Sequence, residues 1–130
     1  MKILIIDDDQ ALAEIWKIAF KKDGHTVFHA ASAREGIEAA KKEQPDFILL
    51  DQIMPDMRGN DALKILKADD STKNIAVALL SNYNETEMMN EAIQEGAVDY
   101  ILKYQVEPED LATKIQTLTT GAQNAPTQQG

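Results

Sequence analysis

The sequence predicts an α/β domain in which helices cover both faces of a five-stranded parallel sheet. Two observations carry this prediction. Short apolar runs alternate with longer helical patterns along the chain, which is typical of repeated strand–helix units. The apolar runs are unbroken rather than alternating with polar residues, which indicates strands that are buried on both faces. Right-handed crossovers between parallel strands then leave few topologies.

Five apolar runs supply the strands, and polar or turn-forming residues bound each of them. Ile3–Ile6 contains only Ile and Leu and is followed at once by three aspartates, and Phe47–Leu50 is equally apolar. Branched and aromatic residues of this kind favour strands. The expected strands cover residues 3–6, 26–28, 47–50, 75–80 and 98–102.

Five helical patterns separate and follow these strands. In the first, apolar residues recur between Leu12 and Phe20 at three- and four-residue spacing, which marks the buried face of an amphipathic helix. Asp9 is expected to cap this helix, and Ser32 with Glu35 forms a capping-box pattern at the start of the second. The periodic apolar residues lie within 12–20, 37–40, 62–66, 88–93 and 111–118.

Length and composition fit one globular domain. The chain has 130 residues, 44% of them hydrophobic, with a formal net charge of −9 and no cysteine. This length suffices for one hydrophobic core, and the acidic balance argues against direct nucleic-acid binding. The lack of cysteine excludes disulfides and thiolate chemistry. No apolar run is long enough for a signal peptide or a membrane span, so a cytoplasmic protein without membrane contact is expected.

The domain is expected to span residues 1–119. Residues 120–130 hold no large apolar group, which is typical of a disordered tail or the start of a linker. No internal repeat interrupts this organisation.

Residues that can carry chemistry follow four of the five expected strands. The carboxyl ends of parallel strands meet at one edge of the sheet, where such folds bind their ligands. Carboxylates, a hydroxyl group and an ammonium group are therefore expected to lie together. They belong to Asp7, Asp8 and Asp9 after the first strand, Asp51 after the third, Ser81 after the fourth and Lys103 after the fifth.

The clustered carboxylates predict a site for Mg²⁺, with Mn²⁺ as a substitute. Like charges at short range near a surface repel by on the order of a few kcal/mol, and a hard divalent cation with oxygen ligands relieves that repulsion. Asp7 and Asp8 are the expected ligands, and a solvated acidic turn is the plainer alternative for them. Asp9 is expected to act as the helix cap.

Asp51 is expected to be a nucleophile, because a carboxylate at the end of a buried strand can form an aspartyl phosphate. The transferred group carries spread negative charge and needs positive charge and hydrogen-bond donors beside it. Lys103 can supply the charge and Ser81 a hydroxyl donor. Each of these residue types is common by itself, so the combination on one edge carries the prediction.

At these residues the sequence resembles the receiver domains of bacterial two-component response regulators, those of the chemotaxis regulator kind included. The resemblance covers about residues 2–119 and implies a flavodoxin-like (βα)5 doubly wound fold with strand order 2-1-3-4-5. Four motifs carry it in order: Ile-Leu-Ile-Ile-Asp-Asp-Asp near the start, Asp51-Gln-Ile-Met-Pro-Asp-Met-Arg-Gly, Leu80-Ser81, and Gly96-Ala-Val-Asp-Tyr-Ile-Leu-Lys.

The resemblance also implies a role for each matching residue. Asp51 resembles the phosphoacceptor, which also contacts the metal. Among the other metal contacts, Asp8 resembles a direct Mg²⁺ ligand, Asp7 a ligand mainly through water, and the backbone carbonyl of Ile53 a third protein contact. The switch residues are a hydroxyl at Ser81 and an aromatic at Tyr100, and Lys103 resembles the family's salt-bridge lysine.

The function that the resemblance implies is a phosphoryl-accepting signalling switch in a two-component phosphorelay. A sensor histidine kinase or a phosphotransfer protein would donate the group. A downstream protein or effector domain would read the face made by the fourth helix, fifth strand and fifth helix. Such a domain assists its own phosphorylation and slow dephosphorylation but is not an enzyme. The alternative is a degenerate receiver that binds partners without phosphorylation.

Three departures from the family's pattern bear on this expectation. Tyr104 follows Lys103 where the family commonly has a proline after a cis bond, which a non-proline residue adopts only at a cost of about 3 kcal/mol. Asn82 stands where a smaller residue is usual. Ile53 and Tyr83 are bulky at positions that border water access in the family, which predicts slow self-dephosphorylation.

Two other classes share parts of this pattern. A flavin-binding protein of similar fold would need phosphate-binding donors after the first strand, where three aspartates would instead repel a phosphate. A phosphatase with an aspartyl nucleophile usually carries a second acid two positions later, and that position holds Ile53. The sequence therefore favours a phosphoacceptor over either class.

Overall fold

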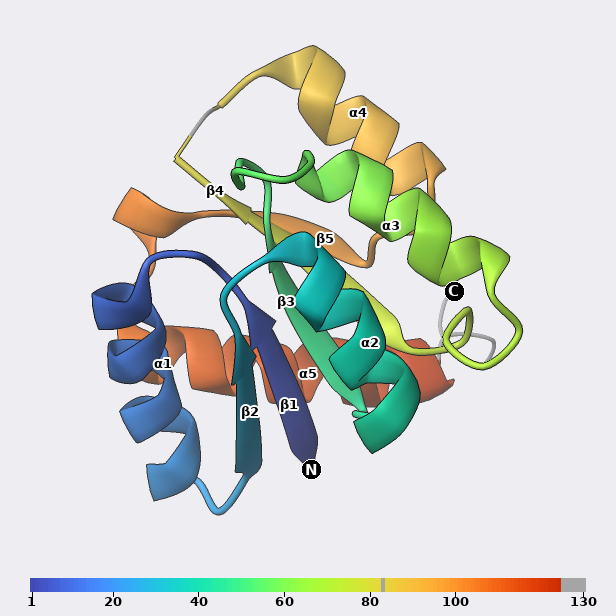
Figure 1. Ribbon diagram of the computed structural model, residues 1–130. Coiled ribbons are helices and arrows are strands. Elements are labelled where there is room, and N and C mark those ends of the chain that lie inside the picture. Colours follow the sequence, from blue (N-terminus) through green and yellow to red (C-terminus); the bar gives the residue numbers. More distant parts are fainter. Residues whose placement is uncertain (83, 125–130) are drawn as a thin grey trace.

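The computed structural model describes residues 1–82 and 84–124 and shows a parallel sheet between two layers of helices (Figure 1). The strands are β1 (Lys2–Ile6), β2 (Thr26–Ala30), β3 (Phe47–Asp51), β4 (Ala76–Ser81) and β5 (Asp99–Leu102). The helices are α1 (Gln10–Lys22), α2 (Ala33–Glu43), α3 (Gly59–Ala68), α4 (Thr86–Gln94) and α5 (Pro108–Asn124), with a short 3-10 turn η1 (Lys103–Gln105).

The sheet has the strand order β2-β1-β3-β4-β5, and each neighbouring pair is parallel. Helices α1 and α5 cover one face, and α2, α3 and α4 cover the other (Figure 1). The predicted fold class and topology are therefore confirmed. The five expected strands are all present, and the largest difference in their bounds is at β2, which continues to Ala30.

The unbroken apolar strands serve both cores of the domain. Successive side chains of a strand point to opposite faces, so Leu4 and Ile6 of β1 pack against the α2, α3 and α4 layer, whereas Ile3 and Ile5 pack against α1 and α5. All four of these side chains are fully buried. A strand that feeds two cores cannot alternate apolar with polar residues, which is why the runs in the sequence are continuous.

The predicted helix caps are confirmed at both helices for which they were expected. The Asp9 side chain accepts a hydrogen bond from the Leu12 N–H at 3.0 Å, and Ser32 Oγ accepts one from the Glu35 N–H at 3.2 Å. The Glu35 carboxylate reaches back to the N–H of Ala31 at 3.3 Å rather than to that of Ser32. The capping box is therefore present with its return bond displaced by one residue.

Helix α5 continues to Asn124, past residue 119 where the domain was expected to end. Residues 125–130 lie outside the described residues, so the tail remains an expectation. Within the described part of the chain, no helix is long and apolar enough to cross a membrane.

Candidate functional site

The carboxyl ends of four neighbouring strands deliver polar side chains to one edge of the sheet. Asp7 directly follows β1, Asp51 is the last residue of β3, Ser81 is the last of β4, and Lys103 directly follows β5. Beside them lies an open pocket of about 270 Å³. Its lining residues are Asp8, Asp9, Asp51, Ile53, Asn82 and Lys103.

Three carboxylates meet at this pocket. One oxygen from each of Asp7, Asp8 and Asp51 lies within 4.8 Å of the other two. Asp7 and Asp51 are buried and Asp8 is exposed. The fourth nearby acid, Asp9, is engaged with the first turn of α1 as its cap. The structure thus brings together the three carboxylates that the sequence analysis placed at the metal site.

Lys103 lies between two of these carboxylates. Its Nζ atom is 3.1 Å from Asp7 Oδ2 and 3.1 Å from Asp51 Oδ1, and only 10% of its side chain is exposed. Burial alone would lower the pKa of Lys103, but attraction to Asp51 and Asp7 outweighs burial and raises it. The lysine therefore remains an ammonium group at neutral pH.

Asp51 has a carboxyl group that resists ionisation. Burial is the main cause and the charge of Asp7 is the next, and together they raise the pKa of Asp51 to about 7 despite the opposing charge of Lys103. The single ammonium group of Lys103 therefore does not offset burial and the charge of Asp7 together. A further positive charge at the pocket would favour the ionised, nucleophilic form of Asp51.

The carboxylate cluster fits a hard divalent cation. The Oδ2 atom of Asp7 is buried, and its close polar neighbour is the ammonium group of Lys103 at 3.1 Å. The other oxygen of Asp7, Oδ1, accepts a hydrogen bond from the Asp9 N–H at 2.9 Å. A cluster of three carboxylates offers oxygen ligands only, which suits Mg²⁺ and Mn²⁺ better than softer metals.

The remaining expected residues lie around this cluster. Ser81 is almost fully buried in β4, and its register partner in β5 is Leu102. Tyr100 is 8% exposed, with its hydroxyl 3.9 Å from Met88 Sδ. Ile53 has an exposed side chain at the rim of the pocket.

No peptide bond is cis in residues 1–82 and 84–124, so the Lys103–Tyr104 bond is trans. Tyr83 lies outside the described residues.

Sequence reasoning missed Asp56, which ties the loop after β3 to another helix. Its two carboxylate oxygens accept hydrogen bonds from the N–H groups of Ala33 and Arg34 at 3.1 and 2.9 Å, at the start of α2. The bond from the Arg34 N–H is the main cause of a lowered pKa of Asp56, and the bond from the Ala33 N–H adds to it. Asp56 thus supplements the cap from Ser32. No local sequence signal could reveal it, because the helix that it caps lies more than twenty positions away.

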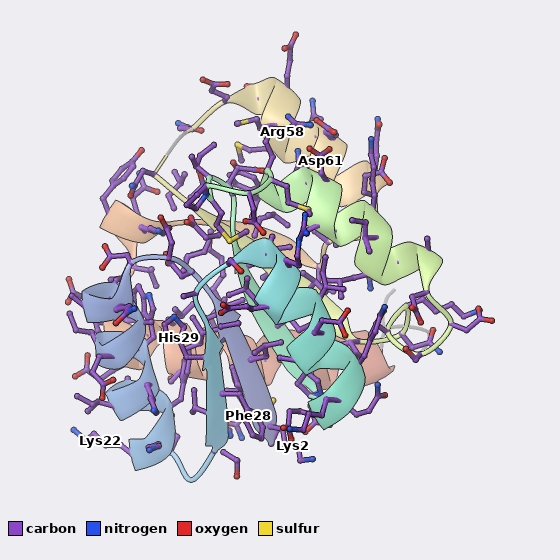
Figure 2. The ribbon with its side chains drawn as sticks, viewed as in Figure 1. Lys2, Lys22, Phe28, His29, Arg58 and Asp61 are labelled. Atoms are coloured by element: carbon purple, nitrogen blue, oxygen red, sulfur yellow. The ribbon has the colours of Figure 1, made fainter. Side chains whose placement is uncertain are left out.

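Sequence reasoning also missed a pair of buried amides beside the phosphoacceptor candidate. Gln52 and Asn60 are both fully buried, and their side chains are joined by a hydrogen bond of 2.9 Å. His29 on β2 (Figure 2) similarly went unremarked, and its Nε2 lies 2.8 Å from the backbone carbonyl oxygen of Asp7. The sequence offers no signal for the amide pair, because Gln52 follows Asp51 and Asn60 stands between Gly59 and Asp61, as exposed polar residues often do.

Gly59, in the second of the four motifs, is required by close packing. A Cβ atom there would lie 2.5 Å from the carbonyl oxygen of Asp51 and 2.9 Å from the Cα atom of Gln52. Only glycine lets the start of α3 approach the end of β3 so closely. The approach lets the Gly59 N–H donate to the carbonyl oxygen of Gln52 at 2.7 Å.

The chain matches a known family over most of its length. The family model described as response regulator receiver domain matches residues 3–116. The sequence is 35% identical to sporulation initiation phosphotransferase F of Bacillus subtilis over 102 residues, which are 78% of this chain and 81% of that protein. It is 29% identical to the DNA-binding response regulator MtrA of Mycobacterium tuberculosis over 88% of this chain. The match spans 49% of MtrA, about half its length.

Solved structures give the same result. A CheY-like response regulator receiver domain protein from Methanospirillum hungatei superposes with a TM-score of 0.86 and 31% identity, over 95% of this chain and 97% of that one. The receiver domain of a putative LuxO repressor protein from Vibrio parahaemolyticus gives a TM-score of 0.85 and 25% identity, over 99% and 97%. With its sheet order and its acidic edge, the chain belongs to the response regulator receiver domain family.

Proposed function

We propose that this receiver domain accepts a phosphoryl group on Asp51 from a phosphohistidine of a sensor histidine kinase or phosphotransfer protein. The observation that carries the proposal is the ammonium group of Lys103, 3.1 Å from both Asp7 and Asp51, beside three clustered carboxylates. Cations that balance the clustered carboxylates also stabilise the negative charge of a phosphoryl group as it is transferred to the buried nucleophile. The name of the Bacillus relative, a phosphotransferase, supports the same direction.

In the proposed step, a carboxylate oxygen of Asp51 attacks phosphorus while the bond from phosphorus to the donor histidine nitrogen breaks. The electron pair of that bond returns to the imidazole ring. The step needs ionised Asp51, whose pKa is raised to about 7, so the nearby cations also determine how much nucleophile is present. Bound Mg²⁺, held by Asp7, Asp8, Asp51 and the carbonyl of Ile53, would neutralise charge on the transferred group.

The ammonium group of Lys103 is proposed to move toward Asp51 when that residue is phosphorylated. In the structure its ammonium group is shared between Asp7 and Asp51. A phosphoryl group adds roughly two negative charges, which draws the ammonium group toward Asp51. Ser81, from the end of the neighbouring strand, would donate its hydroxyl hydrogen to a phosphoryl oxygen. We assign the domain no turnover reaction of its own beyond self-phosphorylation and slow dephosphorylation.

The output face is proposed to be the surface of α4, β5 and α5. Tyr100 of β5, Met89 of α4 and Lys114 of α5 help to line an open pocket there of about 300 Å³. A change in Tyr100, the proposed switch aromatic, would therefore alter the surface that a downstream protein or effector domain contacts. A population shift between two arrangements of this face would suffice for signalling.

Ile53 is proposed to prolong the phosphorylated state. Its side chain is 46% exposed and lines the pocket that Asp51 faces, where it would hinder an attacking water molecule. Replacing it by Asn is expected to shorten the aspartyl-phosphate lifetime, as measured by loss of the phosphoryl group over time. An unchanged lifetime in Ile53→Asn would contradict this role.

The second candidate function is a degenerate receiver that binds partners without phosphorylation. Intact-mass analysis after incubation with acetyl phosphate and Mg²⁺ separates the two. The wild type should gain the mass of one phosphoryl group, and Asp51→Asn should gain none. Asp9→Asn is the matched control, because it makes the same change in the same pocket while asparagine still caps the helix. If the wild type gains no mass, the degenerate receiver is the correct function.

A further inference from the structure

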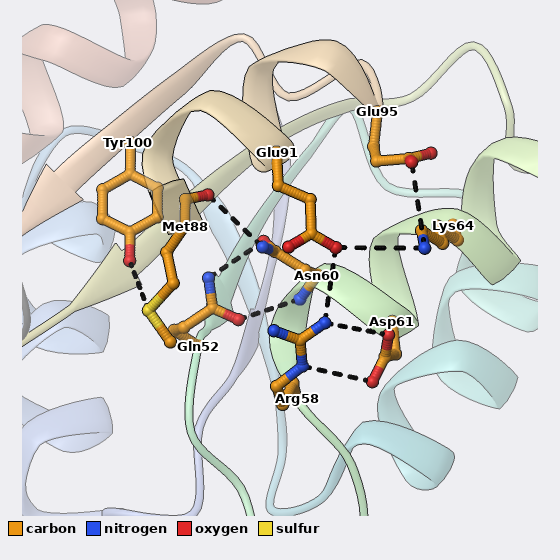
Figure 3. Close-up of polar contacts among 9 residues, drawn as sticks. All are labelled: Gln52, Arg58, Asn60, Asp61, Lys64, Met88, Glu91, Glu95 and Tyr100. Atoms are coloured by element: carbon orange, nitrogen blue, oxygen red, sulfur yellow. Dashed lines mark hydrogen bonds and ion pairs between the residues drawn. The ribbon is translucent and has the colours of Figure 1, made fainter. Parts of the chain in front are cut away.

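A fully buried pair of amides links the end of β3 to helix α3. Gln52, the residue directly after Asp51, accepts a hydrogen bond on Oε1 from the Asn60 N–H and donates from Nε2 to Asn60 Oδ1, both at 2.9 Å (Figure 3). Its backbone continues the sheet, since its N–H donates to the carbonyl oxygen of Leu80 at 3.1 Å. Gln52 is therefore fixed through both its backbone and its side chain.

This pair serves as the cap of α3. The N-cap residue Arg58 makes no side-chain capping bond among the described residues, and Gln52 supplies acceptors to the first two helical N–H groups instead, through its carbonyl oxygen and Oε1. A flipped Gln52 amide would set its NH₂ group against the Asn60 N–H, so only one orientation satisfies both side chains. The pair thus has one geometry, and a displacement of Gln52 must displace Asn60.

Asn60 carries the link on to helix α4. Its Nδ2 donates to the carbonyl oxygen of Met88, in the first turn of α4, at 3.3 Å (Figure 3). The Tyr100 hydroxyl donates to the thioether sulfur of the same Met88 at 3.9 Å. One residue of α4 therefore contacts both the amide pair behind Asp51 and the proposed switch aromatic.

The first turn of helix α4 is held mainly by Met88 and Met89, which are partly buried against the core. Ala92 alone of its residues is buried in the described structure, and its N-cap residue Glu85 makes no side-chain capping bond there. The ion pairs to α3 lie on the outer surface and further along the helix, at Glu91 and Glu95 (Figure 3). The bond from Asn60 is thus a part-buried polar contact through which α3 holds the start of α4.

We propose that Gln52 and Asn60 are positioning residues that transmit the state of Asp51 to Met88 and the start of α4. The inference rests on the proposed phosphorylation of Asp51. A change at Asp51 displaces the adjacent Gln52, the amide pair displaces Asn60, and the Met88 carbonyl follows. Tyr100 also contacts Met88, so both the amide pair and the aromatic ring are affected by phosphorylation of Asp51.

The test uses the full chain with ¹³C-labelled methionine methyl groups, with acetyl phosphate and Mg²⁺ as the probe. The quantity measured is the displacement of the Met88 methyl signal on phosphorylation, divided by the phosphorylated fraction from intact mass. In Asn60→Leu this ratio should fall roughly twofold or more relative to the wild type. Arg58→Ala is the matched control, because it removes only surface ion pairs, those to Asp61 and Glu91. In this variant the ratio should stay at the wild-type value.

A second variant guards against misfolding of the first. Gln52→Leu with Asn60→Leu removes both amides together, so neither side chain is left without its partner, and it should show the same reduced ratio. An unchanged ratio in the folded variants, or an equal loss in Arg58→Ala, overturns the inference. So does a phosphorylated wild type whose Met88 signal does not move, or failure of both leucine variants to fold. A wild type that takes up no phosphoryl group refutes the proposed function instead, which the mass measurement shows separately.

Discussion

Two adjacent residues, Asp51 and Gln52, lie in buried polar clusters of opposite character. Asp51 belongs to a charged cluster of three carboxylates, two of which pair with a single ammonium group. Gln52 belongs to a neutral cluster in which donors and acceptors are matched in one geometry. The cluster around Asp51 has excess negative charge, so an added cation or phosphoryl group changes its energy strongly. The cluster around Gln52 has matched hydrogen bonds, which hold it in one geometry. One chain position therefore separates a site that receives a signal from a contact suited to pass it on.

The comparison is tested most strongly by removing the charge at Asp51. Its pKa is raised to about 7, so between about pH 4 and pH 7 the folded protein keeps a proton that the unfolded chain releases, and wild-type stability falls as pH rises through that window. Asp51→Asn lacks this cost. The variant should be more stable than the wild type by on the order of 2–3 kcal/mol at pH 8, after allowance for screening at the pocket mouth.

The measurement is urea unfolding of both proteins at pH 4 and pH 8, without divalent cations. The difference should be small at pH 4, where both folded proteins are neutral at this position. Saturating Mg²⁺ should narrow the gap at pH 8, because the ion binds the folded wild type and stabilises it by mass action. A gap of equal size at both pH values would show that neither burial nor the charge of Asp7 opposes ionisation of Asp51.

Substitutions in the neutral cluster should lower the stability of the protein, because each one leaves a buried amide without its hydrogen-bond partner. Asn60→Leu leaves the Gln52 amide buried without its side-chain partner, which is expected to cost about 2 kcal/mol. The double variant with Gln52→Leu leaves only the backbone N–H at position 60 to satisfy and should cost less than the sum of the two single changes. A double-variant cycle by urea unfolding measures this coupling. Additive losses would mean that the two amides act independently.

The same contrast explains what the sequence could and could not predict. The fold class and the carboxyl-edge residues followed from apolar runs and from the residue after each strand, since a parallel sheet places all such residues at one edge. The strand order came from the resemblance to receiver domains. The amide pair could not be predicted, because Gln52 and Asn60 lie in a strand end and a helix start whose approach depends on the missing side chain of Gly59. Contacts set by packing distance leave no periodic pattern in the sequence.

At Asp56, further along the loop after β3, a charged side chain makes its contacts at the protein surface. Asp56 accepts two bonds from the start of α2, and Asp56→Ala should lower stability by about 1 kcal/mol, as for other helix caps. The pKa of Asp56 is lowered by those bonds, so its contribution is present above the ordinary carboxyl pKa and is lost as pH falls through the lower folded value. Urea unfolding at pH 7 and pH 2.5 measures this, with Asp56→Asn as the control that retains an acceptor. An equal loss in both variants would exclude a capping role.

The smallest effect is expected for the ion pairs on the surface between α3 and α4. Arg58 lies 3.3 Å from both Asp61 and Glu91, with 44% of its side chain exposed (Figures 2 and 3). Exposed pairs contribute about 0.2–1 kcal/mol each, and salt screens them. Arg58→Ala should therefore lower stability by less than about 1 kcal/mol, and that loss should disappear at high salt.

Salt dependence distinguishes this contact from the amide pair that lies beneath it. The loss in Asn60→Leu involves no charge and should be the same at low and high salt, because ions do not screen a buried hydrogen bond between neutral groups. Urea unfolding of both variants at two salt concentrations makes the comparison. If the Asn60→Leu loss also faded with salt, the hold on α4 would come from surface charge, and a neutral buried contact could not be what links Asp51 to that helix.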